Sequence, residues 1–107
     1  EKNKWFQKII ERSEIIPTLN YEWGIKWGFL FDDIWIKNSS YKNWDQSDHF
    51  LEVTIKFKNT NSAVFYTLLK VPTLNANETH LFEDEMSISD GSDKKHEGEA
   101  VLYRLNK

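Results

Sequence analysis

Cysteine is absent from this sequence, and its absence excludes several kinds of chemistry. Disulfide bonds, thiol catalysis and cysteine-ligated zinc sites all need cysteine side chains. A chain without cysteine needs no oxidising compartment for disulfide formation, which fits the cytosol, and we expect a cytoplasmic location.

Long apolar runs are missing too, since none approaches the roughly 18 residues that a membrane-spanning helix needs. Charged residues make up 29% of the 107 residues and hydrophobic residues 39%, with a net charge of -3. This profile is typical of a soluble globular domain. We expect a single domain over residues 1–107 that buries roughly two thirds of its unfolded surface and has no membrane partner.

Motifs of known catalytic or cofactor sites are also missing. The sequence lacks Gly-x-Ser-x-Gly, a phosphate-binding glycine loop and His-Glu-x-x-His. The three histidines, His49, His80 and His96, are far apart and fit ordinary surface positions better than a catalytic or metal site. Asp90-Gly91 fits a turn better than a calcium loop, because no bidentate glutamate follows at the required spacing. We therefore expect no enzyme activity, no catalytic residues, no metal and no cofactor.

What the sequence does contain is alternation, most clearly from Phe50 to Val71. In the first half of this stretch every second residue is apolar, and these residues are Leu51, Val53, Ile55 and Phe57. Residues 63–71 are apolar on both faces, which indicates a strand that is central in its sheet or lies under another element. The tetrapeptide Asn59–Ser62 favours a turn, and Pro72 ends the second strand. We predict a long β-hairpin.

Other stretches predict one helix and several shorter strands. Trp5, Phe6, Ile9 and Ile10 have helical spacing, which predicts a helix over about residues 3–15 whose apolar stripe packs on a sheet. Bulky residues alternate from 23 to 31, and Gly24 and Gly28 there mark bulges or the close approach of another element. Further strands are predicted at 34–37, 80–82, 86–88 and 101–105, and a polar loop at 89–98.

These elements predict a mainly β (α+β) fold. Short connections between successive strands imply an antiparallel curled sheet or sandwich of about six to seven strands. The one N-terminal helix is expected at one end or face of this sheet.

Acidic side chains concentrate in the last third of the chain. Residues 73–107 hold 8 acidic and 4 basic residues, whereas residues 1–72 hold 9 and 10. This asymmetry argues against nucleic acid as a ligand and favours a basic protein partner, whose association the carboxylates would accelerate. A solvated loop that keeps the protein soluble explains the same pattern equally well.

Large aromatic residues occur in a predicted polar loop over residues 38–49. Tyr41 and Trp44 of this loop either cover the core or wait for a partner, and covering the core is the commoner outcome. Trp35 is out of phase with its apolar neighbours, so it is the better candidate for a surface tryptophan.

The chain resembles a known class of proteins in its overall architecture. Three features carry the likeness, namely the opening helix with Trp5-Phe6, the tryptophan-rich strand from Trp23 to Trp35 and the hairpin from Phe50 to Val71. With acidic loops and no active site, it is similar to bacterial immunity proteins, the cognate inhibitors of contact-dependent growth inhibition and polymorphic toxins. The likeness covers most of the chain, but it assigns no toxin-contacting residue of that class to a position in this chain.

The resemblance implies a function and a set of candidate residues. Toxins of this kind are often basic nucleases, and their inhibitors offer carboxylates where substrate phosphate would sit. It also implies a monomer that forms a heterodimeric complex with its toxin. The carboxylates are expected to pair with Lys or Arg, and the aromatic residues to act as anchors. The first candidates are six carboxylates, namely Glu83, Asp84, Glu85, Asp90, Asp93 and Glu97. A second candidate patch consists of three residues of the polar loop, namely Tyr41, Trp44 and Asp45.

Two other functions stay open. A small-molecule or glycan-binding β-domain would use Trp35 and Trp44 as exposed aromatic faces on which sugars stack. A hydrolase would need two or three carboxylates or histidines to converge in one cleft.

Overall fold

The computed structural model describes residues 4–15, 20–26, 33–60, 63–83 and 96–106, and the structural statements below concern these residues. Its elements, in chain order, are α1 (Lys4–Glu11), β1 (Ser13–Ile15), β2 (Tyr21–Lys26), β3 (Asp33–Asn38), β4 (His49–Phe57), β5 (Ala63–Val71), β6 (Thr79–Phe82) and β7 (His96–Leu105). No helix among them is long and apolar enough to cross a membrane.

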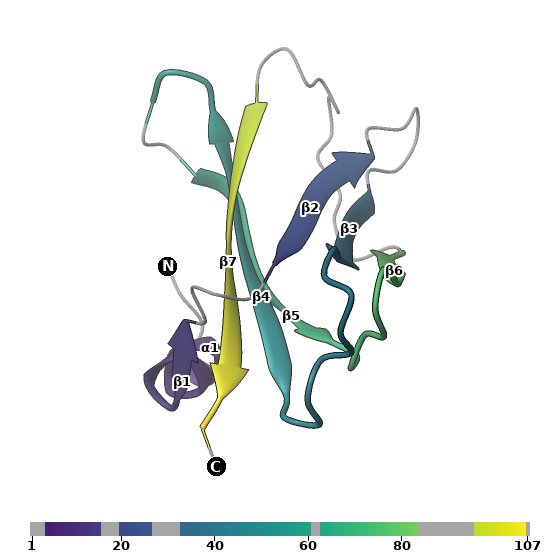
Figure 1. Cartoon of the computed structure of the whole chain (residues 1–107). Helices are drawn as coiled ribbons and strands as arrows, with labels where there is room; N and C mark the ends of the chain where they lie inside the picture. Colours follow the sequence, from purple (N-terminus) through teal and green to yellow (C-terminus); the bar gives the residue numbers. More distant parts are fainter. Residues whose placement is uncertain (1–3, 16–19, 27–32, 61–62, 84–95, 107) are drawn as a thin grey trace.

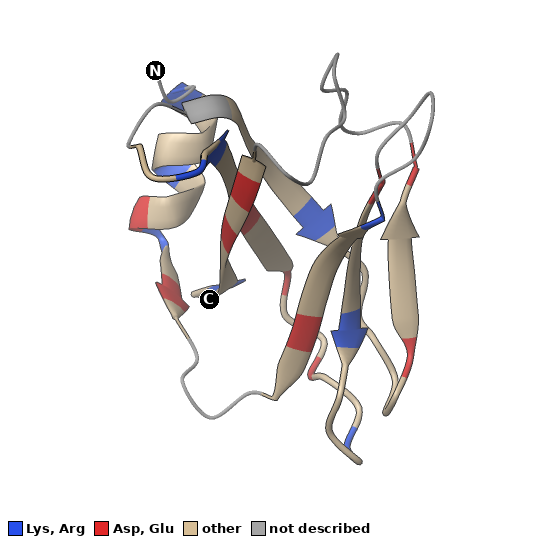
Figure 2. Ribbon diagram, turned by 90° about the horizontal axis from the view of Figure 1, so that it is seen from above, with Lys and Arg blue, Asp and Glu red and all other residues tan. Residues whose placement is uncertain are grey.

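The strands form two antiparallel sheets that pack face to face (Figure 1). The larger sheet has the order β1-β7-β4-β5, and the smaller sheet has the order β2-β3-β6. Helix α1 lies on the outer side of the larger sheet, away from the smaller one (Figure 2). The predicted mainly β fold with one N-terminal helix is confirmed.

The predicted hairpin from Phe50 to Val71 is present as β4 and β5. Leu51 lies opposite Leu69, and the inward side chains of β4 belong to the core between the sheets. Asn59 has a φ of 63°, a left-handed conformation that asparagine tolerates better than most residues. Phe57 was expected to be buried on the inner face but is 41% exposed. It is the last residue of β4, where the core ends, and its ring stacks on that of His96.

Strand β5 lies at the edge of the larger sheet, so the expectation that it is central is wrong. Its inner face packs into the core through Leu69 and Val71. On its outer face Leu68 is 5% exposed, and the ring of Tyr66 contacts that of Phe6 in α1 with centroids 5.9 Å apart. The alternative expectation, cover by another element, therefore explains the two apolar faces.

Helix α1 is shorter than predicted, because it ends at Glu11 and residues 13–15 form β1. Strand β1 pairs with the C-terminal strand, Glu14 lying opposite Arg104. Long-range pairing with β7 therefore overrides the local helical pattern. The helix contributes no fully buried residue to the core.

Two glycines mark close approaches between elements. A Cβ atom on Gly24 would lie 2.8 Å from the Trp35 ring of the neighbouring strand, which confirms the expected close approach there. A Cβ atom on Gly98 of β7 would lie 2.8 Å from the Trp23 ring of the facing sheet. Gly28 and the rest of the predicted strand beyond residue 26 lie outside the described residues.

The last strand is longer than predicted. Strand β7 begins at His96, so residues 96–98, predicted as loop, pair with the end of β4. The hydrogen-bonding edge of β4 extends to Phe57, which allows the ladder to continue. The predicted strand at 80–82 is confirmed as β6, whereas the one at 86–88 lies outside the described residues.

Candidate partner-binding surfaces

The described residues of the two predicted binding patches lie at opposite ends of the sandwich (Figure 1). Glu83 follows β6 and Glu97 is near the start of β7, beside the end of β4. The loop with Tyr41 and Asp45 connects β3 to the start of β4. Strand β4 has nine residues, and roughly 30 Å of extended chain separates its ends. The candidates therefore do not form one compact patch.

Of the first predicted patch, the structure describes Glu83 and Glu97, and we call these two residues together with Glu99, which was not predicted, the carboxylate end. Glu83 and Glu97 are exposed, and neither side chain forms an ion pair or hydrogen bond with another described residue. Glu99 pairs with Lys56, its Oε1 atom lying 3.0 Å from Nζ. The other predicted carboxylates, Asp84, Glu85, Asp90 and Asp93, lie outside the described residues.

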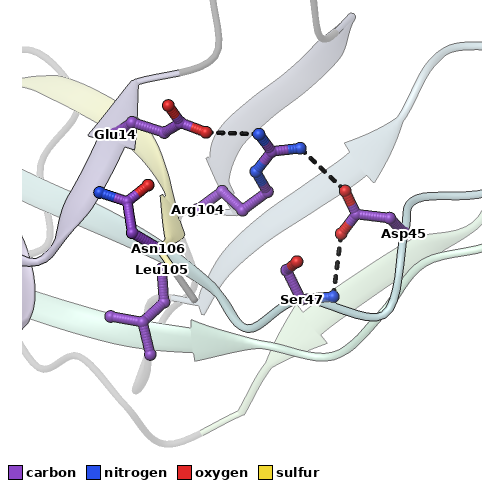
Figure 3. A pocket seen from close by; sticks show the side chains of 6 residues that line it. All are labelled: Glu14, Asp45, Ser47, Arg104, Leu105 and Asn106. Atoms are coloured by element: carbon purple, nitrogen blue, oxygen red, sulfur yellow. Dashed lines mark hydrogen bonds and ion pairs between the residues drawn. The ribbon is translucent and has the colours of Figure 1, made fainter.

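At the opposite end Arg104 joins two carboxylates (Figure 3). Its Nη1 donates to Asp45 Oδ2 at 2.9 Å, and its Nη2 donates to Glu14 Oε1. The backbone N–H of Ser47 donates to the other oxygen of Asp45 at 2.9 Å and, with Arg104, holds the pKa of Asp45 below its usual value. Both carboxylates raise the pKa of Arg104, Glu14 more strongly. Arg104 therefore offsets one of the two carboxylate charges, and both carboxylates already have an ion-pair partner within the chain.

A small hollow of about 250 Å³ lies beside this network (Figure 3). It is smaller than the pockets that usually hold small-molecule ligands, which measure roughly 300–1,000 Å³. No group of three or more potential metal ligands occurs in the described part of the chain. The residues that line the hollow are Glu14, Asp45, Ser47, Arg104, Leu105 and Asn106.

The buried amide of Asn38 shapes the loop that carries Tyr41 and Asp45. Its Nδ2 donates to the carbonyl oxygens of Lys42, Leu74 and Asn75 at 2.8, 3.3 and 3.2 Å. Its Oδ1 accepts from the N–H and hydroxyl of Ser40 at 3.0 and 2.8 Å. Asn38 thereby ties residues 39–48 to the segment between β5 and β6. Asn38 was predicted to lie in a polar loop but ends β3, and no local sequence signal indicates this role.

Trp44 covers the core instead of facing a partner. It is 4% exposed and stacks on the His49 ring at 4.6 Å between centroids. The expectation that Trp44 covers the core is confirmed, and the prediction that it anchors a partner at the surface is wrong. Trp35 is half-buried against Gly24, so the two tryptophans do not form an exposed platform for sugars. Tyr41, in contrast, is 85% exposed.

Two of the three histidines are buried, so the expectation of surface positions is wrong for them. His49 Nδ1 lies 2.9 Å from the carbonyl oxygen of Ser47, and burial lowers the pKa of His49. His96 stacks on Phe57 at 5.0 Å between centroids. These two histidines begin β4 and β7, at opposite ends of the sandwich. They do not converge on a common cleft.

A carboxylate bridges two phenols on the outer face of the larger sheet. Tyr66 Oη donates to Glu52 Oε2 at 2.5 Å, and Tyr103 Oη donates to Glu52 Oε1 at 3.2 Å. Burial, and then the Glu52 carboxylate, raise the pKa of both tyrosines. The three residues come from β4, β5 and β7, and no local sequence signal marked them.

Comparison with known proteins finds no relative. No protein-family model, no curated protein and no solved structure matches the chain. The resemblance to immunity proteins therefore stays a prediction. Only the charge, exposure and pairing of the described residues distinguish the two candidate surfaces.

Proposed function

We propose that this chain is a non-catalytic cytoplasmic immunity protein that neutralises a basic, nuclease-type toxin by binding it through the carboxylate end. The observation that carries the proposal is the exposure of Glu83 and Glu97 without a described ion-pair partner. At the opposite end, Asp45 already pairs with Arg104. A carboxylate without a partner keeps its charge for an incoming Lys or Arg, whereas a paired one must first exchange its partner.

The sequence between these two glutamates adds to the charge. Residues 84–95 carry Asp84, Glu85, Asp90 and Asp93 against two lysines. Enzymes that bind nucleic acid place clustered Lys and Arg around the phosphate path. A carboxylate-rich surface would approach such a cluster rapidly and compete with the phosphates for it.

The test begins with capture of a partner. Immobilised chain is exposed to extract of its native host at low and at high salt, and we expect one stoichiometric basic protein that high salt releases. The activity of the recovered protein on nucleic acid is then measured with and without this chain. Recovery of no such protein, or full activity of the recovered protein in the complex, would contradict the proposal.

Matched variants then locate the surface. We expect the double variant Glu83→Gln, Glu97→Gln to bind the captured protein about tenfold more weakly and with less salt dependence. The reason is that two ion pairs with Lys or Arg of that protein are lost. The control removes the same charge from exposed glutamates elsewhere, Glu11→Gln with Glu22→Gln. Equal loss of affinity in both double variants would show that net charge, not the carboxylate end, determines binding.

A further inference from the structure

In the part of the chain that the structure describes, the outer edge of β5 has little protection against pairing with another strand. Among the described strands, β5 pairs only with β4. Proteins usually protect such edges with charges, prolines, bulges or short strands. The bulge beside Ile55 affects only the start of β5 and leaves a regular run from Phe65 to Val71. In this run Lys70 is the only charged residue, and no proline occurs.

Helix α1, which packs on β5, carries an exposed aromatic side chain. Trp5 of α1 is 56% exposed. Its ring lies 5.5 Å from that of Phe6, which in turn contacts Tyr66 of β5. A row of aromatic rings therefore runs from the exposed side of α1 to the edge strand.

We propose that a second copy of this chain pairs with β5, antiparallel, across a two-fold axis at Leu68. This register overlaps the whole regular run, placing Leu68 opposite its own copy and Phe65 opposite Val71 of the second copy. Directly opposite residues of an antiparallel pair face the same side, so on the inner face Phe65 meets Val71 and Thr67 meets Leu69. The larger sheets of both copies then form one continuous sheet.

Charge complementarity favours a second copy in this register. Lys70, whose Nζ lies 3.9 Å from Asp48 Oδ1 of its own chain in a solvent-exposed pair, lies opposite Tyr66 of the other copy, whose hydroxyl donates to the Glu52 carboxylate. The ammonium group thus approaches a phenol–carboxylate pair, and the symmetry creates this contact twice. The two Lys70 residues are offset by four positions, roughly 13 Å along the strand, where salt screens most of their repulsion.

This assembly is independent of the proposed function and differs from the monomer that the resemblance implies. Because the two β5 strands run in opposite directions, the carboxylate ends of the two copies point away from each other. Each copy therefore keeps its carboxylate end free for a partner.

The oligomeric state of the purified chain tests the proposal. Sedimentation velocity from low to high micromolar concentration is expected to give twice the chain mass of 12.8 kDa. Lys70→Glu places a carboxylate beside Glu52 of the other copy and should raise the dissociation constant at least about tenfold. Lys42→Glu, the same change on an exposed loop lysine, should leave it within twofold. A monomer at every concentration, or equal effects of both variants, overturns the proposal.

Cross-linking tests the register, because the chain has no cysteine of its own. Under mild oxidation Leu68→Cys should form a covalent dimer, since symmetric residues at the axis are directly opposite. Lys70→Cys should not, because its symmetric copy is too far away for a disulfide. Circular dichroism verifies that both variants are folded. A folded Leu68→Cys chain that fails to cross-link, or equal cross-linking of both variants, excludes this interface.

Discussion

Asn38 shows how one buried side chain places a surface loop. Its amide uses both donor and acceptor atoms, and its partners come from residues 40–42 and 74–75. Backbone carbonyls that are buried without a donor cost free energy, so a side chain that satisfies several of them contributes strongly. The exposed position of Tyr41 depends on this arrangement.

We expect Asn38→Asp to destabilise the protein by about 3–5 kcal/mol, because it turns a carboxylate toward carbonyl oxygens that need a donor. Urea denaturation measures the change in the free energy of unfolding. Asn43→Asp is the matched control, since Asn43 Oδ1 accepts from the Ala76 N–H on the exposed surface and a carboxylate keeps that acceptor. This control should change stability by less than about 0.5 kcal/mol. Similar losses in both variants would show that the Asn38 donors are unimportant.

At the scale of elements, the two sheets fit together because glycine leaves room for tryptophan. Gly98 of β7 lies against Trp23 of β2, and a Cβ atom there would also lie 3.1 Å from Ile55 Cδ1. The contact joins strands of different sheets, so it determines how closely the layers approach. Gly24 does the same within the smaller sheet, where the Trp35 ring lies over it.

Gly98→Ala is expected to destabilise the sandwich by about 1–3 kcal/mol through overpacking. Trp23→Leu provides space for the added methyl group, so the two substitutions together should cost at least about 1 kcal/mol less than the sum of their separate effects. Thermal and urea unfolding of the two single variants and the double variant measure this coupling. Strictly additive effects would mean that Trp23 does not limit the space at Gly98.

For the whole molecule, the proposed binding surface and the groups that govern acid stability lie at different ends of the sandwich. The carboxylate end presents Glu83 and Glu97 without a described partner. The other end contains His49 and Asp45, whose pKa values are both lowered in the folded state. Figure 2 shows that acidic and basic positions are otherwise interspersed over both sheets.

The pH dependence of unfolding follows from these two groups. Burial lowers the pKa of His49 from 6.5, so the unfolded chain binds this proton first and stability falls as the pH drops below 6.5. Asp45 adds a further loss below its unfolded value of 3.8. Urea denaturation over this range measures the loss. His49→Gln should flatten the part of the profile between about pH 7 and pH 5, and an unchanged slope there would contradict the assignment to His49.

Local pattern alone determined several features of this protein. The period of two in β4 identifies Leu51, Val53 and Ile55 as buried, because alternate side chains of a strand face opposite sides. The turn at Asn59 and the end of β5 before Pro72 follow from backbone preferences of single residues.

Only the tertiary structure decided which distant residues meet. Arg104 binds Asp45 and Glu14, which are 59 and 90 positions away, and no local pattern encodes such a pair. The same holds for the edge position of β5, the conversion of residues 13–15 into β1 and the burial of His49. These three features depend on which strand pairs with a given strand and on which side chains cover its faces. The pairing strands and covering side chains come from remote parts of the chain.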